Sequence, residues 1–420
     1  FNVLNYFTTL DAGSAFWICG PSQDMGCRGA NTPEELIRQR NKIVAAISSI
    51  NADVVGLMEI ENNVNDDAVK DLVASLNAVM GENTYAYVET GVIGTDAIKL
   101  AMIYKPASVT LVGNYAILDS SVDSRFLDTK NRPVLAQSFM DLEKGGIFTV
   151  AVNHFKSKGS DCLDVNDPDL GDGAGNCNLT RVTAAQALVD WLESDPTGSG
   201  FTNNLIIGDL NSYDKEDPID AIKLGADDTL NTADDFIDLV FNFQGDKAYG
   251  YVFDGQIGYL DHALANKNLE SKITSVNFWH INADEPDLID YDMSYKKDAQ
   301  DLIYAPDAFR SSDHDPVIIG LDICDAIPPT LEVSVTPDTL WSPNHKYVEV
   351  HATVTANDNF DKTPTISLIS VTSNEPDDAD GKGDGETVDD IVIVDAFHFL
   401  LRAERAGNGS GRVYTITYSV

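Results

Sequence analysis

Short apolar runs alternate with helical patterns over the first three quarters of the chain. The segment Thr32-Pro33-Glu34-Glu35 supplies an N-cap, a first-turn proline and a capping-box glutamate, and apolar residues then recur at helical spacing to about residue 50. The next apolar run, 54–58, is typical of a strand buried on both faces. Similar strand patterns return at 100–104, 134–139, 147–153, 204–208 and 317–321, and helical patterns at about 66–80 and 181–193. This alternation predicts a mixed α/β sandwich.

The pattern changes at Pro328-Pro329. Beyond this point apolar and polar residues alternate in short segments separated by turn-forming clusters, which predicts a small β-sandwich. We therefore expect a boundary at 324–329, with domains at 1–324 and 325–420. The chain begins at Phe1 in a strand-like segment and ends in another, so we expect both ends to be cut from a longer chain. A signal peptide would then lie outside this sequence.

Charge is spread unevenly along the 420 residues, whose formal net charge is −39. Residues 1–160 hold 13 basic and 18 acidic side chains, whereas 161–324 hold 9 and 33, and 325–420 hold 6 and 16. The total argues against binding nucleic acid through a wide basic surface, but the nearly balanced first part leaves room for a local phosphate-binding groove. No run of about 18 apolar residues occurs, so we expect no membrane-spanning helix in this segment.

Polar residues end or flank four of the predicted strands. Glu59 follows the strand predicted at 54–58, and His154 follows the one at 147–153. Asp209-Leu210-Asn211 follows the strand at 204–208, and Asp313-His314 precedes the one at 317–321. Each alone also fits a structural role, as an ion-pair partner, a hydrogen-bonded histidine or an Asx turn. Carboxylates that converge at a sheet edge bind hard divalent cations, and nearby histidines supply acid–base chemistry. Together the four interruptions favour a metal-dependent phosphoester site.

These motifs, with Asn5 and Tyr259-Leu260-Asp261-His262, resemble the endonuclease/exonuclease/phosphatase superfamily, which includes the DNase I-like nucleases. They occur in the family's order and span about 1–324. The segments 153–159, 172–178 and 309–314 look like the bacterial extracellular nucleases of this superfamily. The resemblance implies a DNase I-like two-sheet α/β sandwich with the site at one rim. Beyond it, 340–346 and 402–405 resemble bacterial immunoglobulin-like modules, which implies a small all-β domain.

The resemblance implies a catalytic Mg²⁺ or Mn²⁺ ion. Glu59 would be its principal ligand, with Asn5 beside it, Asp313 nearby and Asp209 also in reach of the ion. Asp209 would orient or deprotonate the attacking water. The sequence is compatible with one catalytic metal ion or with two.

Histidines would flank the scissile phosphate in this resemblance. His154 and His314 would take these positions, and Asp261 would fix the tautomer of His314. For substrate binding, Asn211 would hold a non-bridging phosphate oxygen, and Arg132 would contact phosphate together with His154. A looser alignment would let Glu89 orient His154.

Five cysteines point to an oxidising compartment. Cys19 and Cys27 bracket one short loop and Cys162 and Cys177 another, and neither pair has zinc-site spacing. We expect two local disulfides, with free buried thiols as the alternative, and Cys324 is left over. With the family resemblance, this favours a bacterial secreted or cell-surface-attached protein.

Two acidic loops are candidate Ca²⁺ sites, although neither matches the EF-hand register. The first spans 161–172 and the second 377–386; each could equally be a solvated acidic loop. The candidate structural ligands in the first loop are Asp164, Asn166, Asp169 and Asp172.

The leading functional hypothesis is a secreted, metal-dependent, sugar-non-specific endonuclease that hydrolyses DNA, with RNA as an open second substrate. No stable protein partner is inferred. One alternative keeps the site but changes the substrate to a phospholipid or phosphomonoester, although no aromatic membrane-binding hairpin is evident in the sequence. Another is a Ca²⁺-dependent surface adhesin whose nuclease-like domain is inert.

Overall fold

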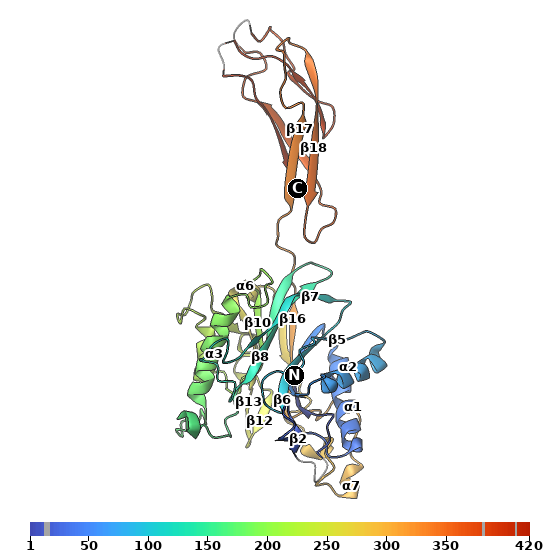
Figure 1. Ribbon diagram of the computed structural model, residues 1–420, viewed down its shortest axis with the longest axis vertical. Coiled ribbons are helices and arrows are strands. Elements are labelled where there is room, and N and C mark those ends of the chain that lie inside the picture. The colour runs from blue at the N-terminus through green and yellow to red at the C-terminus, as the bar shows by residue number, and fades with distance from the viewer. Residues whose placement is uncertain (12–16, 380–382, 408–409) are drawn as a thin grey trace. The chain divides into compact units, whose positions relative to one another are not determined.

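The computed structural model describes residues 1–11, 17–379, 383–407 and 410–420. The chain forms two compact units, Phe1–Cys324 and Asp325–Val420 (Figure 1). The first alternates helices and strands, and the second is built from strands.

Two sheets organise the first unit. The smaller has the order β1-β4-β6-β5 and the larger the order β11-β14-β10-β9-β8-β7. The strands of the smaller sheet are β1 (Asn2–Tyr6), β4 (Val54–Glu61), β5 (Ala86–Tyr87) and β6 (Ile98–Tyr104). Those of the larger sheet are β7 (Val109–Leu118), β8 (Arg132–Asp141), β9 (Ile147–His154), β10 (Asn204–Asp209), β11 (Phe236–Asp238) and β14 (Asp261–Asn266).

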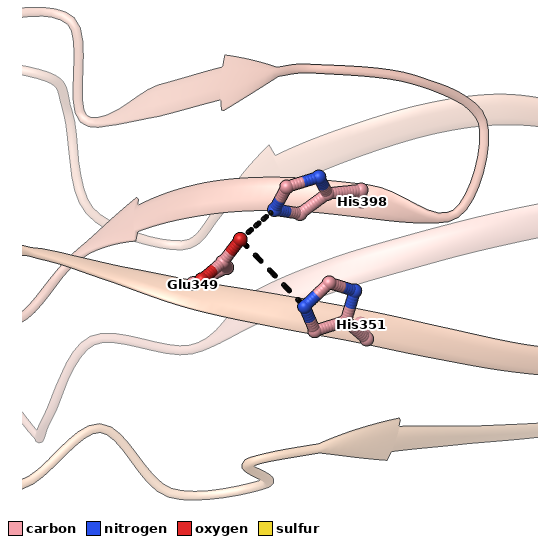
Figure 2. Close-up of side chains that lie close together, drawn as sticks. All are labelled: Glu349, His351 and His398. Carbon is pink, nitrogen blue, oxygen red and sulfur yellow. Dashed lines mark ion pairs between the residues drawn. The ribbon is translucent and has the colours of Figure 1, made fainter.

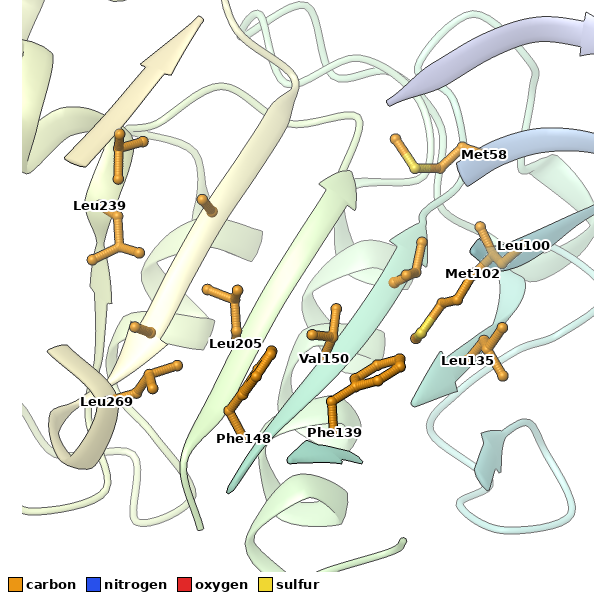
Figure 3. Packing of buried hydrophobic residues seen from close by; sticks show 14 of the residues in the cluster. Met58, Leu100, Met102, Leu135, Phe139, Phe148, Val150, Leu205, Leu239 and Leu269 are labelled. Atoms are coloured by element: carbon orange, nitrogen blue, oxygen red, sulfur yellow. The ribbon is translucent and has the colours of Figure 1, made fainter. Parts of the chain in front are cut away.

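The two sheets pack face to face around an apolar core. Met58 and Met102 of the smaller sheet meet Phe139, Val150 and neighbouring side chains of the larger one (Figure 3). A second core lies between the larger sheet and helices α3 (Asn178–Glu193) and α4 (Asp217–Lys223), and a third lies between the smaller sheet and helices α1 (Pro33–Ile50) and α2 (Asp67–Met80). The α/β sandwich predicted from the sequence is confirmed.

Local sequence signals explain where the main elements begin. Helix α1 starts at the predicted capping box, in which Thr32 accepts a hydrogen bond from the backbone N–H of Glu35 and the Glu35 side chain accepts one from the backbone of Thr32. The predicted helices and long strands are present. Strands β7 and β14 were not predicted, because mixed polarity in the first and the short run in the second hide the period-two signal.

Shorter elements connect these layers. They are β2 (Trp17–Cys19), β3 (Met25–Gly26), β12 (Tyr251–Phe253), β13 (Gln256–Gly258), β15 (Ile273–Phe278), β16 (Val317–Leu321), α5 (Leu239–Gln244), α6 (Lys267–Glu270) and α7 (Asp298–Asp301). Six of these strands form three antiparallel pairs, which are β2 with β3, β12 with β13, and β15 with β16. None of the helices in the described ranges is long and apolar enough to cross a membrane.

The second unit contains two antiparallel sheets around one small core. A four-stranded sheet has the order β17-β18-β21-β20, and β19 pairs with β22. Their bounds are β17 (Thr330–Thr336), β18 (Tyr347–Asn357), β19 (Ser367–Ser373), β20 (Ile391–Ile393), β21 (His398–Arg402) and β22 (Tyr414–Ser419). Val350 and Phe399 from the first sheet pack against Val371 and Ile416 from the second.

Both expected disulfides are present. Cys19 is bonded to Cys27 and Cys162 to Cys177, while Cys324 is exposed and outside both bonds. Each bond closes a loop and so restricts the unfolded chain.

The first acidic loop does not gather its carboxylates. Asp164 pairs with Lys130 at 2.6 Å, whereas Asp169 and Asp172 each accept a hydrogen bond from a backbone N–H two residues along, at 2.8 and 3.0 Å. Asn166 ends a short 3-10 turn in the left-handed region. These three carboxylates form no cluster of convergent ligand atoms within the described part of the chain, and the Ca²⁺ site stays a prediction.

The second acidic loop is also held by contacts within the protein. Arg412, only 1% exposed, reaches Asp384 at 2.5 Å and also pairs with Asp390 and Glu404. A buried guanidinium therefore already offsets part of the charge of these carboxylates. Residues 380–382 of this loop lie outside the described residues.

Candidate active site

Strand register brings four of the predicted site residues into one row. Arg132 of β8 lies opposite His154 of β9, His154 opposite Asp209 of β10, and Asp209 opposite Asp261 of β14. Residues directly opposite each other on neighbouring strands lie about 5 Å apart, so the row follows from pairing alone. The sequence placed His154 and Asp209 at strand ends, and the resemblance suggested Arg132 and Asp261, but neither could give this register.

Gly208 lets strands β9 and β10 meet beside this row. Its φ of +124° is rarely adopted by L-residues, and a Cβ atom there would lie 2.1 Å from the Asn153 carbonyl oxygen. We expect Gly208→Ala to lower the free energy of unfolding by about 2 kcal/mol or more, measured by urea denaturation. The matched control Gly171→Ala also has a positive φ, of +73°, but its Cβ would meet no atom within 4 Å. It should cost only about 1 kcal/mol, and equal losses would contradict the close approach.

The surroundings of His314 favour its charged form. Its Nδ1 is hydrogen-bonded to Oδ2 of Asp261, as the resemblance implied. Burial alone would lower the pKa of His314, but the charges of Asp261, Asp313 and Asp209 outweigh burial and raise that pKa well above its usual value. The ring of Tyr251 stacks on the imidazole, with centroids 4.4 Å apart.

His154 has the opposite electrostatic environment. Burial lowers its pKa well below the usual value, and the positive charges of Arg132 and His314 add to the effect. Arg132 Nη1 lies 3.5 Å from His154 Nε2. Nδ1 of His154 is buried and has no hydrogen-bond partner among the described residues, and Glu89 is exposed. The suggestion that Glu89 orients His154 is therefore wrong.

Asp209 lies between the two histidines. Its Oδ2 is 3.5 Å from His154 Nε2 and 4.0 Å from His314 Nε2. Burial raises the pKa of Asp209 to about 7, with a further contribution from the charge of Asp261 and opposing contributions from His314 and the Asn211 N–H. A carboxyl group with this pKa can exchange a proton near neutral pH.

Asn211 continues the Asp209 turn. Its backbone N–H donates to Asp209 Oδ1 at 2.9 Å, and its own φ is +47°. The side-chain Nδ2 donates to the Phe155 carbonyl at 3.0 Å. One N–H of this amide is therefore held by the protein, and the second can serve a substrate oxygen.

Two acidic side chains, Glu59 of β4 and Asp313, lie beside this row and are called the carboxylate corner below. Burial raises the pKa of Glu59 and the charge of Asp313 adds to this effect, while His314 and Arg132 oppose it. The backbone N–H of Asn5 donates to Glu59 Oε2 at 2.9 Å. Asn5 and Glu59 both have a positive φ, of +54° and +66°, a conformation that concentrates at functional sites when it occurs outside glycine.

The donor set of this corner fits a hard divalent cation. Its oxygen ligands are the types that Mg²⁺ and Mn²⁺ prefer, and the mutual repulsion of Glu59 and Asp313 would be relieved by a cation. Within the described residues, however, Glu59, Asp209 and Asp313 do not converge as three ligand atoms within 4.8 Å of one another. Mg²⁺ characteristically takes one or two carboxylates and completes its shell with water and substrate phosphate, which matches this more open arrangement.

A cationic cavity of about 460 Å³ adjoins the row at Arg132. Arg28, Lys130 and Lys156 line it together with Arg132, against two lining carboxylates, Asp96 and Asp128. Asp96 pairs with Arg132 at 2.9 Å and with Arg28 at 2.8 Å. Burial lowers the pKa of Lys156, and the charges of Arg132 and Lys130 lower it further, so positive charge is in local excess.

Several of these neighbours were missed from sequence. Arg28 follows the disulfide-closed β2–β3 hairpin, and Tyr251 comes from β12; neither belongs to a motif. Asn282 was also missed: its Nδ2 donates to the His314 carbonyl and its Oδ1 accepts from the backbone N–H of Ser311. Asn282 therefore fixes the loop that carries His314.

Comparisons with known proteins address the whole first unit. Among solved structures, the chain is similar to a Bacteroides thetaiotaomicron mannosyl-6-phosphatase (15% identity, TM-score 0.46, covering 70% of this chain and 96% of that one). It is also similar to an endonuclease/exonuclease/phosphatase from Bacteroides vulgatus (14% identity, TM-score 0.43, covering 68% and 91%). A comparison with curated proteins found no match. The sequence profile of the endonuclease/exonuclease/phosphatase family matches residues 2–322. The chain therefore belongs to the endonuclease/exonuclease/phosphatase family, whose members hydrolyse phosphoester bonds.

Proposed function

We propose that this protein is a secreted, metal-dependent endonuclease that hydrolyses phosphodiester bonds of DNA without regard to the sugar, RNA being a second substrate. The row formed by Arg132, His154, Asp209 and Asp261 supports this proposal, because it places acid–base groups and a phosphate-binding cation side by side. The two disulfides support an oxidising, extracellular location.

The site residues divide the chemistry of in-line phosphodiester hydrolysis. Asp209 orients the attacking water and accepts its proton, for which a pKa of about 7 is suited. His154 and His314 lie on either side of Asp209 Oδ2, where they flank the phosphate. Asp261 holds the His314 ring by its Nδ1, and Asn211 binds a non-bridging oxygen.

Members of this family typically depend on a divalent metal. Here Glu59, with Asp313, Asp209 and Asn5 around it, would hold Mg²⁺ or Mn²⁺. When bound, such an ion offsets negative charge on the phosphate oxygens. The oxygen ligands of the corner suit these ions better than softer metals.

The cationic cavity is the observation that favours a polynucleotide. A phosphomonoester has a single phosphate, which the row accommodates, whereas a polynucleotide has further phosphates on both sides of the scissile one. Arg28, Lys130 and Lys156 line the cavity beside Arg132, and this positive charge supports the binding of a phosphate next to the scissile one.

We expect Lys156→Ala to weaken DNA binding without changing the chemical step. The KM for plasmid DNA should rise, kcat should stay constant, and the slope of log Kobs against log salt should fall by about 1, as expected when one phosphate contact is lost. The control Lys144→Ala removes an exposed lysine, paired with Asp322, at the opposite end of β9. An unchanged salt slope in Lys156→Ala would place the DNA backbone elsewhere.

A second candidate function is supported by the β12–β13 hairpin. Phe253 and Ile257 on this hairpin are 62% and 67% exposed, and Tyr251 of the same hairpin stacks on His314. Exposed apolar side chains beside a phosphodiesterase site suit a membrane surface. The sequence alone did not reveal this hairpin.

One substrate panel separates the two candidates. Plasmid DNA, RNA, sphingomyelin vesicles and a soluble phosphomonoester are incubated with the full chain and Mg²⁺, and kcat/KM is compared. The endonuclease proposal predicts the highest value for plasmid DNA, unaffected by the double change Phe253→Ser and Ile257→Ser. Preferential sphingomyelin hydrolysis that this double change abolishes would establish the second candidate instead.

A further inference from the structure

Three potential metal ligands meet on the outer face of the second unit. Glu349 and His351 are two residues apart on β18, so their side chains lie on the same face of the strand. His398 of β21 is paired directly opposite His351 (Figure 2). The intervening residue, Val350, points into the core. Strand pairing thus fixes the three side chains as neighbours.

The ligand atoms of this trio converge. Glu349 Oε1 lies 2.7 Å from His398 Nε2 and 3.8 Å from His351 Nε2, and all three atoms lie within 4.8 Å of one another. The two imidazole rings stack with centroids 4.4 Å apart and planes 17° apart. Ligands about 2.0–2.1 Å from a tetrahedral Zn²⁺ are about 3.3 Å from each other, a separation that the two observed distances bracket.

Ion pairing alone does not account for His398. Its Nε2 is buried and makes no hydrogen bond among the described residues, although Glu349 Oε1 lies only 2.7 Å away. The in-plane direction of that nitrogen, where its lone pair or proton lies, therefore misses the carboxylate oxygen. A nitrogen that ligates a metal points in this way towards the ion and past its fellow ligand.

The other converging group in the described ranges gives a useful contrast. Asp384, Asp390 and Glu404 also place carboxylate oxygens within 4.8 Å of one another. Arg412 fills the space between them and pairs with all three. That group has its cation in the protein itself, whereas no Lys or Arg side chain pairs with Glu349 in the described parts of the chain.

We propose that Glu349, His351 and His398 bind a divalent transition-metal ion, with Zn²⁺ the best suited. Two imidazole nitrogens and one carboxylate are a common zinc ligand set, and Ca²⁺ and Mg²⁺ prefer oxygen ligands alone. The fourth position faces solvent, because Glu349 and His351 are 60% and 59% exposed, and water or a ligand from another molecule can occupy it. This site is independent of the catalytic corner, whose ligands are all oxygens.

Calorimetric titration of the full chain with Zn²⁺ tests the proposal. The protein is first stripped of metal with a chelator and then held in excess Mg²⁺, which occupies oxygen-only sites. The wild type should bind one more equivalent of Zn²⁺ than the double variant His351→Ala and His398→Ala. The control Thr353→Ala, on the same exposed face of β18, should bind as the wild type does. X-ray absorption of the bound zinc should show imidazole ligands.

A milder variant keeps the test decisive if the double variant folds poorly. Glu349→Gln preserves shape and removes only the charge, and we expect it to weaken Zn²⁺ binding by at least about 10-fold, the loss seen when even an outer-shell partner is removed. Circular dichroism verifies the fold of each variant. Equal Zn²⁺ stoichiometry and affinity in the wild type and in folded variants would overturn the proposal.

Discussion

Replacing His154 by alanine is expected to reduce kcat for plasmid hydrolysis by at least about 10²-fold, the usual contribution of a positioned acid–base group. His154 is buried, and its Nε2 lies 3.5 Å from both Asp209 Oδ2 and Arg132 Nη1, so the substitution removes the imidazole that we propose flanks the phosphate. The measurement is the initial rate of supercoiled plasmid loss at saturating substrate and Mg²⁺.

His345→Ala is the matched control for this change. His345 lies in the second unit, where its Nδ1 is 3.2 Å from Glu404 Oε2. Its substitution should leave kcat unchanged. A wild-type rate in His154→Ala, with both proteins folded, would remove His154 from the mechanism.

Removing the metal, or replacing its expected principal ligand Glu59, should reduce plasmid hydrolysis at least as much as His154→Ala does. EDTA should abolish hydrolysis and Mg²⁺ or Mn²⁺ should restore it. Glu59→Gln should raise the Mg²⁺ concentration needed for half-maximal activity by at least about 10-fold, since losing even an outer-shell partner costs that much affinity. Mg²⁺ should bind less tightly to Glu59→Gln because the cation no longer relieves the repulsion between the Glu59 and Asp313 carboxylates.

Glu89→Gln is the control for the metal experiment. Glu89 is an exposed carboxylate close in sequence to the same sheet, and among the described residues it makes no hydrogen bond to His154 Nδ1. Its substitution should leave the Mg²⁺ dependence unchanged. An identical Mg²⁺ dependence in Glu59→Gln would move the metal away from this corner.

Much of the fold could be predicted because its signals are local. The capping box at Thr32 and the apolar run from Val54 identify α1 and β4 within a few residues. The row of site residues depends instead on register, which arises from pairing between strands far apart in the chain. Motifs placed His154 and Asp209 at strand ends, and only the paired strands β9 and β10 show them opposite each other.

The missed residues share a physical cause. Arg28 and Tyr251 reach the site from short hairpins whose position depends on a disulfide and on tertiary packing. The trio of Glu349, His351 and His398 was missed for the same reason, since two of its ligands are 47 residues apart in sequence and meet only across β18 and β21. The Ca²⁺ loops stay predictions, since sequence spacing does not show that Asp164 of the first loop pairs with Lys130 and Asp384 of the second with Arg412.

The net negative charge is compatible with a nuclease when the charge at the site is considered separately from the charge on the rest of the surface. Only a few of the 67 acidic side chains line the site, and cations gather in the cavity beside Arg132. The remaining negative charge repels DNA over most of the surface, so binding should be local and sensitive to salt.

The proposed endonuclease activity is tested most directly by comparing the cleavage of supercoiled plasmid in Mg²⁺ by the full chain and by Asp209→Asn. Asp209 lies between both histidines, and asparagine keeps its shape while removing its capacity to accept a proton. We expect nicked and then linear DNA with the wild type, no products in EDTA, and a rate at least about 10²-fold lower for the variant. Intact plasmid with the wild type, or equal cleavage by Asp209→Asn, would contradict it.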